Sequence, residues 1–200
     1  VIFKNGKIIA EGFTHLPGHD HAEKDALKRA GNRAKNGEMA VTLEPCCHFG
    51  RTPPCTRAII EAGIKKCYVA LKDPNPLMAG KGIAELKRNG ISVECGICQE
   101  EAREINGDFF KYIKTGIPFV ALKAAITLNG MVAASTGDSR WITSLPARKM
   151  VHKLRSEYDA ILVGMKTVIA DDPELNVRLC KGRNPVRIIV SGGRDLPKES

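Results

Sequence analysis

The sequence HAE at residues 21–23, followed by TLEPCCHFGRTPPC at residues 42–55, decides the fold of this chain. One imidazole, from His21, and two thiolates, from Cys46 and Cys55, form a ligand set that suits a tetrahedral Zn²⁺ ion. Three protein ligands leave the fourth position free for a water molecule, which distinguishes a catalytic zinc site from a closed structural one. The pattern therefore predicts a catalytic zinc centre.

Glu23 is the predicted catalytic residue of this centre. It stands two residues after His21, and the spacing of small and apolar residues predicts a helix from residue 21 to about residue 34. The ligand and the acid therefore share the first turn of one helix. A carboxylate that does not bind the metal can move protons between the metal-bound water and a substrate, as the general acid/base of zinc deaminases does.

The wide spacing of the two thiols is the unusual part of the pattern. Eight residues separate Cys46 from Cys55, whereas two residues separate the thiols in the general deaminase signature. We therefore expect Cys46 in the loop after a strand over 39–43, and Cys55 in the first turn of a helix over 54–62, where the helix dipole favours a thiolate. Between them, His48 and Arg51 supply an imidazole and a cation that suit a phosphorylated substrate. Cys47 is interpreted as a packing thiol, because adjacent residues cannot easily bind one ion.

The composition limits the possible classes of protein. The chain has 200 residues, 43% hydrophobic and 26% charged, which is enough for one large or two small domains. It has no apolar run that could span a bilayer and no signal-peptide pattern, so we expect no membrane partner. Seven cysteines, an odd number, argue against a disulfide framework and for a reducing cytoplasm. The Cys95 and Cys98 pair is interpreted as a chance C-x-x-C.

The net charge of +9 is compatible with nucleic acid, an acidic membrane surface or a phosphorylated small molecule, and it does not choose among them. The basic residues are scattered, and only 5% of the residues are aromatic. A protein that binds single strands would have aromatic residues between its cations. We therefore expect no nucleic-acid partner.

The chain is predicted to contain two α/β domains, at residues 1–114 and 115–200. A hairpin is expected over 1–10, because Asn5-Gly6 suits a two-residue type I′ turn. Strands over 39–43, 67–71 and 91–94 alternate with helices over 54–62 and 81–87, which is typical of a layered α/β domain. A helix over 99–105 and the segment 109–114 lead to the boundary. Beyond it we predict a strand over 119–126, a helix over 145–155 and strands over 160–163 and 186–190.

The sequence resembles one family closely, the bifunctional riboflavin-biosynthesis deaminase-reductases. The resemblance covers essentially the whole chain, through HAE at 21–23, TLEPCCHFGRTPPC at 42–55, KDPNP at 72–76, ALKAAITLNG at 121–130, GDSRWITS at 137–144 and ADDPELNVR at 170–178. It implies a cytidine-deaminase-like three-layer domain followed by a partial dihydrofolate-reductase-like α/β domain. It also implies that the natural chain begins upstream of Val1, where the family has a further substrate-binding asparagine, and continues beyond Ser200.

For the first domain, the resemblance implies zinc-dependent hydrolytic deamination of 2,5-diamino-6-ribosylamino-4(3H)-pyrimidinone 5′-phosphate. Zinc would be held by His21, Cys46 and Cys55, and Glu23 would move protons onto the leaving ammonia. The remaining substrate residues implied are His48 and Arg51 at the phosphate, and Asp73 and Asn75 at the ribose.

For the second domain, the resemblance implies reduction of the ribosyl group to ribityl with NADPH. The substrate residues implied are Lys123, Ser139, Arg155, Leu175 and Arg178, and the cofactor residues implied are Ala125, Trp141, Thr167 and Asp171. The planar donor forks of Arg155 and Arg178 suit a phosphate. Because the family's glycine-rich cofactor loop lies beyond Ser200, we expect this chain alone to oxidise NADPH poorly. We also expect a homo-oligomer.

Two other functions remain open from the sequence. One is a zinc deaminase of another nucleoside or of a nucleic-acid base, which would release ammonia from cytidine, guanine or RNA. The other is a zinc-stabilised module that binds nucleic acid in a salt-dependent way and releases no ammonia.

Overall fold

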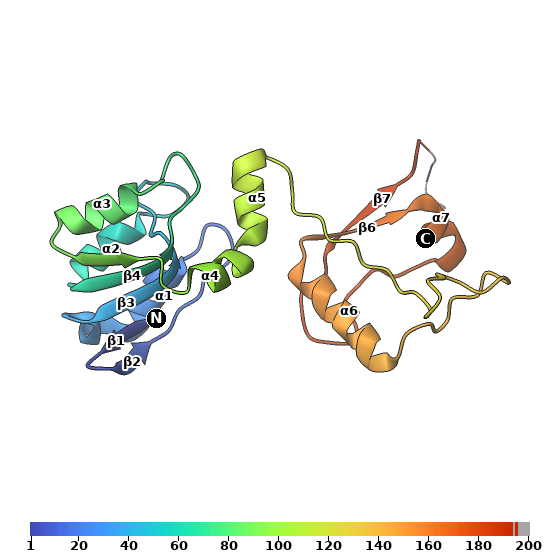
Figure 1. Cartoon of the computed structure of the whole chain (residues 1–200), viewed down its shortest axis with the longest axis horizontal. Coiled ribbons are helices and arrows are strands. Elements are labelled where there is room, and N and C mark those ends of the chain that lie inside the picture. The colour runs from blue at the N-terminus through green and yellow to red at the C-terminus, as the bar shows by residue number, and fades with distance from the viewer. Residues whose placement is uncertain (194, 196–200) are drawn as a thin grey trace. The chain divides into compact units, whose positions relative to one another are not determined.

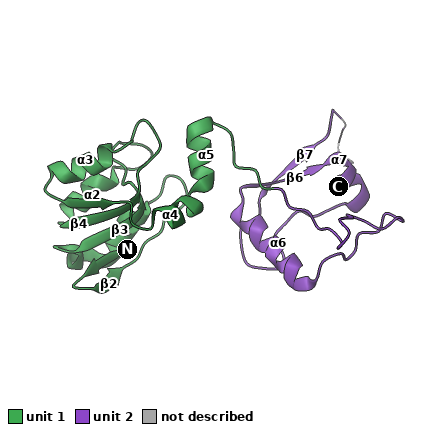
Figure 2. Cartoon of the chain, in the orientation of Figure 1, with its two compact units in different colours: residues 1–121 green, residues 122–200 purple. Residues whose placement is uncertain are grey.

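The computed structural model describes residues 1–193 and 195, and it divides the chain into two compact units, Val1–Ala121 and Leu122–Ser200 (Figures 1 and 2). The domain boundary predicted after residue 114 falls at the end of helix α5 (Gly107–Thr115), whereas the first unit extends to Ala121. That boundary stays a prediction. No helix in the described part of the chain is long and apolar enough to cross a bilayer.

A mixed five-stranded sheet forms the centre of the first unit. Its order is β2 (Lys7–Ala10), β1 (Ile2–Lys4), β3 (Glu38–Leu43), β4 (Lys66–Leu71) and β5 (Ser92–Cys95). Strands β3, β4 and β5 are parallel, and β1 is antiparallel to both of its neighbours. Asn5 and Gly6 between β1 and β2 have φ values of 52° and 73°, which confirms the predicted hairpin.

Helices cover both faces of this sheet. On one face lie α1 (Ala22–Ala30), which continues as the 3₁₀ turn η1 (Gly31–Ala34), then α2 (Cys55–Glu61) and α3 (Lys81–Arg88). Helix α1 contacts α2, and α2 contacts α3. Helix α4 (Gln99–Ile105) contacts β4 and is followed by α5 (Figure 1).

The side chains of β4 alternate between the two helical layers. Cys67 and Val69 are fully buried in a core that also contains Ile59 of α2 and residues of α1. Tyr68 and Ala70, which point the other way, line a cleft together with residues of α4. The predicted three-layer α/β arrangement is therefore confirmed, and the predicted strands and helices of this unit are present within a few residues of their expected bounds.

The second unit has fewer regular elements. They are α6 (Leu145–Glu157), β6 (Ala160–Gly164), α7 (Met165–Asp171) and β7 (Val186–Val190), and β6 pairs with β7 in parallel. The helix predicted over 145–155 and the strands over 160–163 and 186–190 are confirmed, whereas α7 was not predicted.

The strand predicted over 119–126 is wrong, because residues 117–127 have no regular secondary structure. The segment is rich in strand-forming residues, but a strand also needs a neighbour that accepts its backbone hydrogen bonds. None of the described strands pairs with this segment. The composition of the segment favours a strand, but no described strand lies beside it to pair with.

Candidate metal centre

Three ligand atoms converge beside the N-terminal ends of α1 and α2. His21 Nδ1 lies 3.6 Å from Cys46 Sγ and 3.4 Å from Cys55 Sγ, and the three donor atoms lie within 4.8 Å of one another. With the bond lengths usual for zinc in proteins, a tetrahedral ion separates its nitrogen and sulfur ligands by about 3.6 Å. The three side chains therefore have the identity and the spacing that a zinc ion requires.

The local sequence explains how these ligands come together. His21 is the N-cap of α1, with extended backbone angles, and Cys55 is the first residue of α2, directly after Pro54. Cys46 lies in the loop after β3, as predicted. The N–H of Cys55 donates to Cys46 Sγ at 3.3 Å, and the N–H of Thr56 donates to the Cys46 carbonyl at 3.1 Å. The Cys46 loop thus caps α2, which brings the two widely spaced thiols together.

The pKa values of the two thiols are shifted in opposite directions. A hydrogen bond from the Cys55 thiol, helped by the Cys55 N–H and by His21, lowers the pKa of Cys46 to about 5. The pKa of Cys55 is raised, because its proton is held by Cys46 and because the side chain is buried. Cys46 therefore loses its proton more readily than Cys55, and binding of a zinc ion would require the proton of Cys55 to leave as well.

Glu23 lines the same cleft as the ligands His21 and Cys46. It is the second residue of α1, and only 9% of its surface is exposed. Burial raises its pKa, and the nearby Cys46 sulfur adds to this effect. A carboxyl group with a raised pKa can both accept and release a proton near neutral pH, as a general acid/base must.

The cleft has a volume of about 720 Å³ and is lined by several of the predicted substrate residues. His48, Asp73 and Asn75 line it together with Glu23 and the ligands His21 and Cys46. Arg51 is exposed and is not among the lining residues. Cys47 lies 3.9 Å from the sulfur of Met78 and is outside the set of three donors, in agreement with a packing role. The roles of these residues in substrate binding stay predictions.

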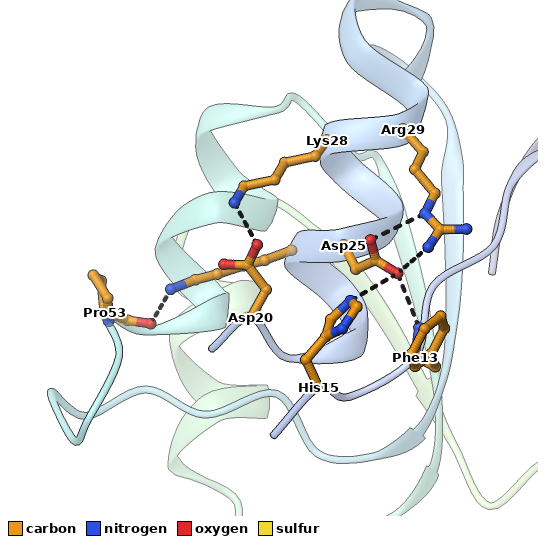
Figure 3. Close-up of polar contacts among 8 residues, drawn as sticks. Phe13, His15, Asp20, Asp25, Lys28, Arg29 and Pro53 are labelled. Carbon is orange, nitrogen blue, oxygen red and sulfur yellow. Dashed lines mark hydrogen bonds and ion pairs between the residues drawn. The ribbon is translucent and has the colours of Figure 1, made fainter. Parts of the chain in front are cut away.

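A polar network anchors the loop before α1 (Figure 3). The Asp25 carboxylate accepts the N–H of Phe13 at 3.3 Å and pairs with Arg29 at 2.9 Å. The Lys24 ammonium donates to the Pro53 carbonyl, just before α2. These contacts fix the loop to α1 and α1 to the start of α2, so the two helix starts that carry metal ligands are held together.

The second unit has a cavity of its own, of about 570 Å³. The predicted reductase residues that line it are Lys123, Ala125, Ser139, Trp141, Arg155, Asp171, Leu175 and Arg178. Thr167 does not line it and lies exposed on α7. The structure thus gathers eight of the nine predicted residues around one cavity, although their roles stay predictions.

Sequence reasoning missed three residues that shape these sites. Glu44 is buried beside the metal ligands and is 3% exposed. In the second unit, the Arg148 guanidinium lies 3.8 Å from the centre of the Trp141 ring, and His152 Nδ1 accepts the N–H of Arg178 at 3.1 Å. Burial, with help from Arg155 and Arg178, lowers the pKa of His152, which keeps its ring a neutral acceptor. The sequence signal that could have drawn attention to Glu44 is its position directly before Pro45 and the ligand Cys46.

Comparisons with known proteins agree with this geometry. Residues 1–71 match the family described as the cytidine and deoxycytidylate deaminase zinc-binding region, and residues 118–200 match the RibD C-terminal domain. The fold and the site therefore define a zinc-binding domain of the cytidine-deaminase class, followed by a region that matches the RibD C-terminal domain.

Relatives match along almost the whole chain. The riboflavin biosynthesis protein RibD of Aquifex aeolicus is 53% identical over 98% of this chain and 56% of that protein. RibD of Actinobacillus pleuropneumoniae is 46% identical over 98% of this chain and 52% of that protein. A Thermotoga maritima crystal structure, described as a diaminohydroxyphosphoribosylaminopyrimidine deaminase/5-amino-6-(5-phosphoribosylamino)uracil reductase, superposes with a TM-score of 0.88 at 46% identity over 94% of this chain and 54% of that chain. One crystal form of RibD from Acinetobacter baumannii superposes with a TM-score of 0.86 at 46% identity, over 94% of this chain and 55% of that chain.

The chain belongs to the RibD family, and it spans about half the length of the curated relatives it matches. This confirms the resemblance that the sequence motifs indicated. It also confirms the expected fold class, a cytidine-deaminase-like domain followed by the RibD reductase-type domain.

Proposed function

We propose that the first unit hydrolytically deaminates 2,5-diamino-6-ribosylamino-4(3H)-pyrimidinone 5′-phosphate in riboflavin biosynthesis. The observation that carries this proposal is the meeting of one imidazole and two sulfurs next to a cleft that His21, Cys46 and the buried carboxylate of Glu23 line. The Thermotoga maritima relative is named for a deaminase of this class of substrate, which supports the choice of a phosphorylated pyrimidine.

Different residues of the site would bind the metal and transfer the proton. His21, Cys46 and Cys55 would hold a zinc ion, which would supply a water made reactive at neutral pH. The Glu23 carboxylate accepts a proton and delivers it to the amino nitrogen, so that the carbon–nitrogen bond breaks and ammonia leaves while water supplies the new carbonyl oxygen. Burial of Glu23 excludes bulk water from this transfer.

The other lining residues hold the substrate. The His48 imidazole binds the 5′-phosphate, and Asp73 and Asn75 form hydrogen bonds to the ribose hydroxyls. Arg51, exposed on the same insert as His48, meets the part of the phosphate that extends out of the cleft. The Asp73 carboxyl is half-buried, and burial raises its pKa, which suits a group that shares hydrogen bonds with neutral hydroxyls.

The second unit would contribute to the next step, reduction of the ribosyl group to ribityl by a hydride from NADPH and a proton. The cavity around Arg155 and Arg178 supports this, because two guanidinium groups beside Lys123 suit a phosphorylated ligand. Trp141 and Asp171, which the resemblance assigns to the cofactor, also line this cavity. A homo-oligomeric assembly, a cytoplasmic location and the absence of a nucleic-acid partner stay predictions.

Replacing Glu23 by Gln tests the proposal. The amide keeps the shape of the side chain but cannot carry the proton, so ammonia release from the diaminopyrimidine phosphate should fall by roughly 10²- to 10⁴-fold. Zinc content, measured by atomic absorption, should stay at the level of the unmodified chain. Glu61→Gln is the matched control, because Glu61 is exposed and only pairs with Arg57 on the surface of α2.

Two outcomes contradict the proposal. One is a Glu23→Gln chain that turns over the substrate at the normal rate. The other is an unmodified chain that releases ammonia from cytidine, guanine or RNA but not from the diaminopyrimidine phosphate, or that binds nucleic acid and releases none.

A further inference from the structure

A buried carboxylate connects the metal-bearing segment to a distant loop. Glu44 follows the last residue of β3 and precedes Pro45 and Cys46. Its Oε2 accepts the N–H groups of Asp73 at 3.1 Å and Gly80 at 2.9 Å. Its Oε1 accepts the N–H groups of Gly82 at 2.9 Å and Ile83 at 3.2 Å. Each oxygen therefore accepts two hydrogen bonds, which uses the acceptor capacity of an ionised carboxylate.

Two of these N–H groups, those of Asp73 and Gly80, lie at the ends of one loop, residues 72–80, which we name the Asp73 loop, and the other two lie in the helix that follows it. Asp73 stands near its start, Gly80 is the N-cap of α3, and Gly82 and Ile83 are in the first turn of that helix. The first N–H groups of a helix have no partner within the helix, and the helix dipole favours a negative charge there. Glu44 thus caps α3 and clamps both ends of the Asp73 loop.

The loop itself is shaped by its own side chains. Asp73 Oδ1 accepts the N–H of Asn75 at 2.8 Å, and Asn75 Oδ1 accepts the N–H of Leu77 at 3.0 Å. These turns set the internal form of the loop but do not attach it to the metal centre. The hydrogen-bonded attachment comes from Glu44, whose own N–H also donates to the Leu71 carbonyl at the end of β4 at 2.8 Å. The buried Met78 adds a packing contact, because its sulfur lies 3.0 Å from His48 Nδ1 and 3.9 Å from Cys47 Sγ.

Close packing of the backbone strengthens the same junction. A Cβ on Gly82 would lie 2.1 Å from the carbonyl oxygen of Pro45, so the start of α3 lies directly against the residue before the ligand Cys46. Pro45 is itself fully buried. The metal ligand, the helix start and the ends of the Asp73 loop therefore form one packed unit.

We propose that Glu44 is a positioning residue of the deaminase cleft, and that its carboxylate holds Asp73 and Asn75 in place relative to the metal ligand Cys46. This inference rests on the function proposed for the cleft. Both oxygens of Glu44 are engaged by backbone N–H groups, so the residue acts through the Asp73 loop and not by contact with substrate. Its effect is on substrate affinity, and metal binding is left to the three donors.

The substitution Glu44→Gln isolates this role. A glutamine has nearly the same volume, but its NH₂ group is a donor and would face two of the four N–H donors. Whichever oxygen is replaced, two N–H groups lose their acceptor: those of Asp73 and Gly80 at the ends of the loop, or those of Gly82 and Ile83 at the start of α3. Either loss loosens the Asp73 loop, directly or through the helix that follows it. Because the loss of a hydrogen bond to a charged group changes an equilibrium constant by roughly 10- to 100-fold, KM for the diaminopyrimidine phosphate should rise by about that factor, with a much smaller change in kcat.

The experiment compares zinc content, kcat and KM of the zinc-loaded chain with those of Glu44→Gln and of the control Glu85→Gln. Glu85 is a half-buried glutamate on α3 that accepts one hydrogen bond, from the Thr56 hydroxyl at 2.9 Å, and does not hold the Asp73 loop. The expected result is a raised KM with normal zinc content for Glu44→Gln only. A normal KM, or loss of zinc in place of a raised KM, overturns the proposal.

Amide hydrogen exchange tests the clamp without substrate. In the unmodified chain, the N–H groups of Asp73, Gly80, Gly82 and Ile83 should be protected, and in Glu44→Gln they should exchange faster while the amides of β3 stay protected. Free exchange of these amides in the unmodified chain overturns the proposal even where the variant fails to fold. An unmodified chain that protects these amides but releases no ammonia would contradict the proposed function, and Glu44 would then have only a structural role. The exchange measurement therefore distinguishes failure of the clamp from failure of the proposed function.

Discussion

Replacing Gly82 by alanine should destabilise the first unit, because the residue has no room for a side chain. Gly82 lies in the first turn of α3, and an added Cβ would lie 2.1 Å from the Pro45 carbonyl oxygen and 3.3 Å from Glu44 Oε1. The oxygen of Pro45 belongs to the backbone of a fully buried residue and cannot swing aside. Helix α3 must therefore move away from Pro45 by about 1.3 Å or more to reach an ordinary contact distance.

The expected loss of stability follows from three contributions. Inserting a methyl group into a packed site costs about 1–3 kcal/mol. Moving α3 also stretches the hydrogen bonds from Gly82 and Ile83 to the Glu44 carboxylate, and a bond to a charged group contributes about 1.5–3 kcal/mol. Alanine favours a helix over glycine by about 0.5–1 kcal/mol, which offsets part of this. The net change should be a destabilisation of about 2–4 kcal/mol, with one of the two hydrogen bonds weakened.

Urea unfolding measures this change, provided that the signal comes from the first unit. The only tryptophan, Trp141, lies in the second unit, so exchange of the buried amides of β3 and β4 is the better signal. Gly107→Ala is the matched control, because Gly107 begins α5 and an added Cβ there meets nothing within 4 Å. The control should be neutral or slightly stabilising. A Gly82→Ala chain within about 0.5 kcal/mol of the unmodified one would refute the packing argument.

Two further substitutions test other parts of the structure. Asp25→Asn should free the loop before α1, because the Asp25 carboxylate pairs with Arg29 and accepts the Phe13 N–H. We expect faster proteolysis within residues 11–20 and a free energy of unfolding lower by about 1–2 kcal/mol. An unchanged rate of cleavage would contradict this. Arg148→Ala should expose one face of Trp141, whose ring centre lies 3.8 Å from the guanidinium, and should destabilise the second unit by about 0.5–1 kcal/mol. Acrylamide should then quench Trp141 fluorescence more strongly than in the control Lys149→Ala, and equal quenching in the two variants would show that Arg148 does not cover the ring.

Local signals in the sequence predicted most of the first unit because the helices α1, α2 and α3 and the strands of the sheet pack on one another. Asn5-Gly6 specified the hairpin through its backbone preference, and the apolar spacing of α1 specified the face that packs in the core. The wrong strand over 119–126 shows the limit of such signals, since pairing depends on a neighbour that the segment itself does not encode. Helix α7 was missed for a related reason: it is only seven residues long and buries two of them, Met165 and Val168.

The candidate site shows the same division between local and distant information. The three metal donors and Glu23 could be predicted because zinc chemistry restricts the residue types. The role of Glu44 could not, because its four partners lie 29 to 39 residues away in the chain and are backbone groups without a sequence signature. Arg51 is a further case, since its place in the insert was known but the direction of its side chain was not.

The wide thiol spacing separates metal binding from substrate recognition. The N–H groups of Cys55 and Thr56 return to the sulfur and carbonyl of Cys46, so the donors have the spacing of a tetrahedral zinc site although eight residues intervene. The insert is therefore free to vary without moving the ligands. It places His48 in the cleft and leaves Arg51 exposed. The insert also contacts the Asp73 loop that Glu44 fixes, since the sulfur of Met78 lies 3.0 Å from His48 Nδ1 and 3.9 Å from Cys47 Sγ. Under the proposed function, changes within the insert should therefore alter which phosphorylated pyrimidine is bound while the metal centre keeps its geometry.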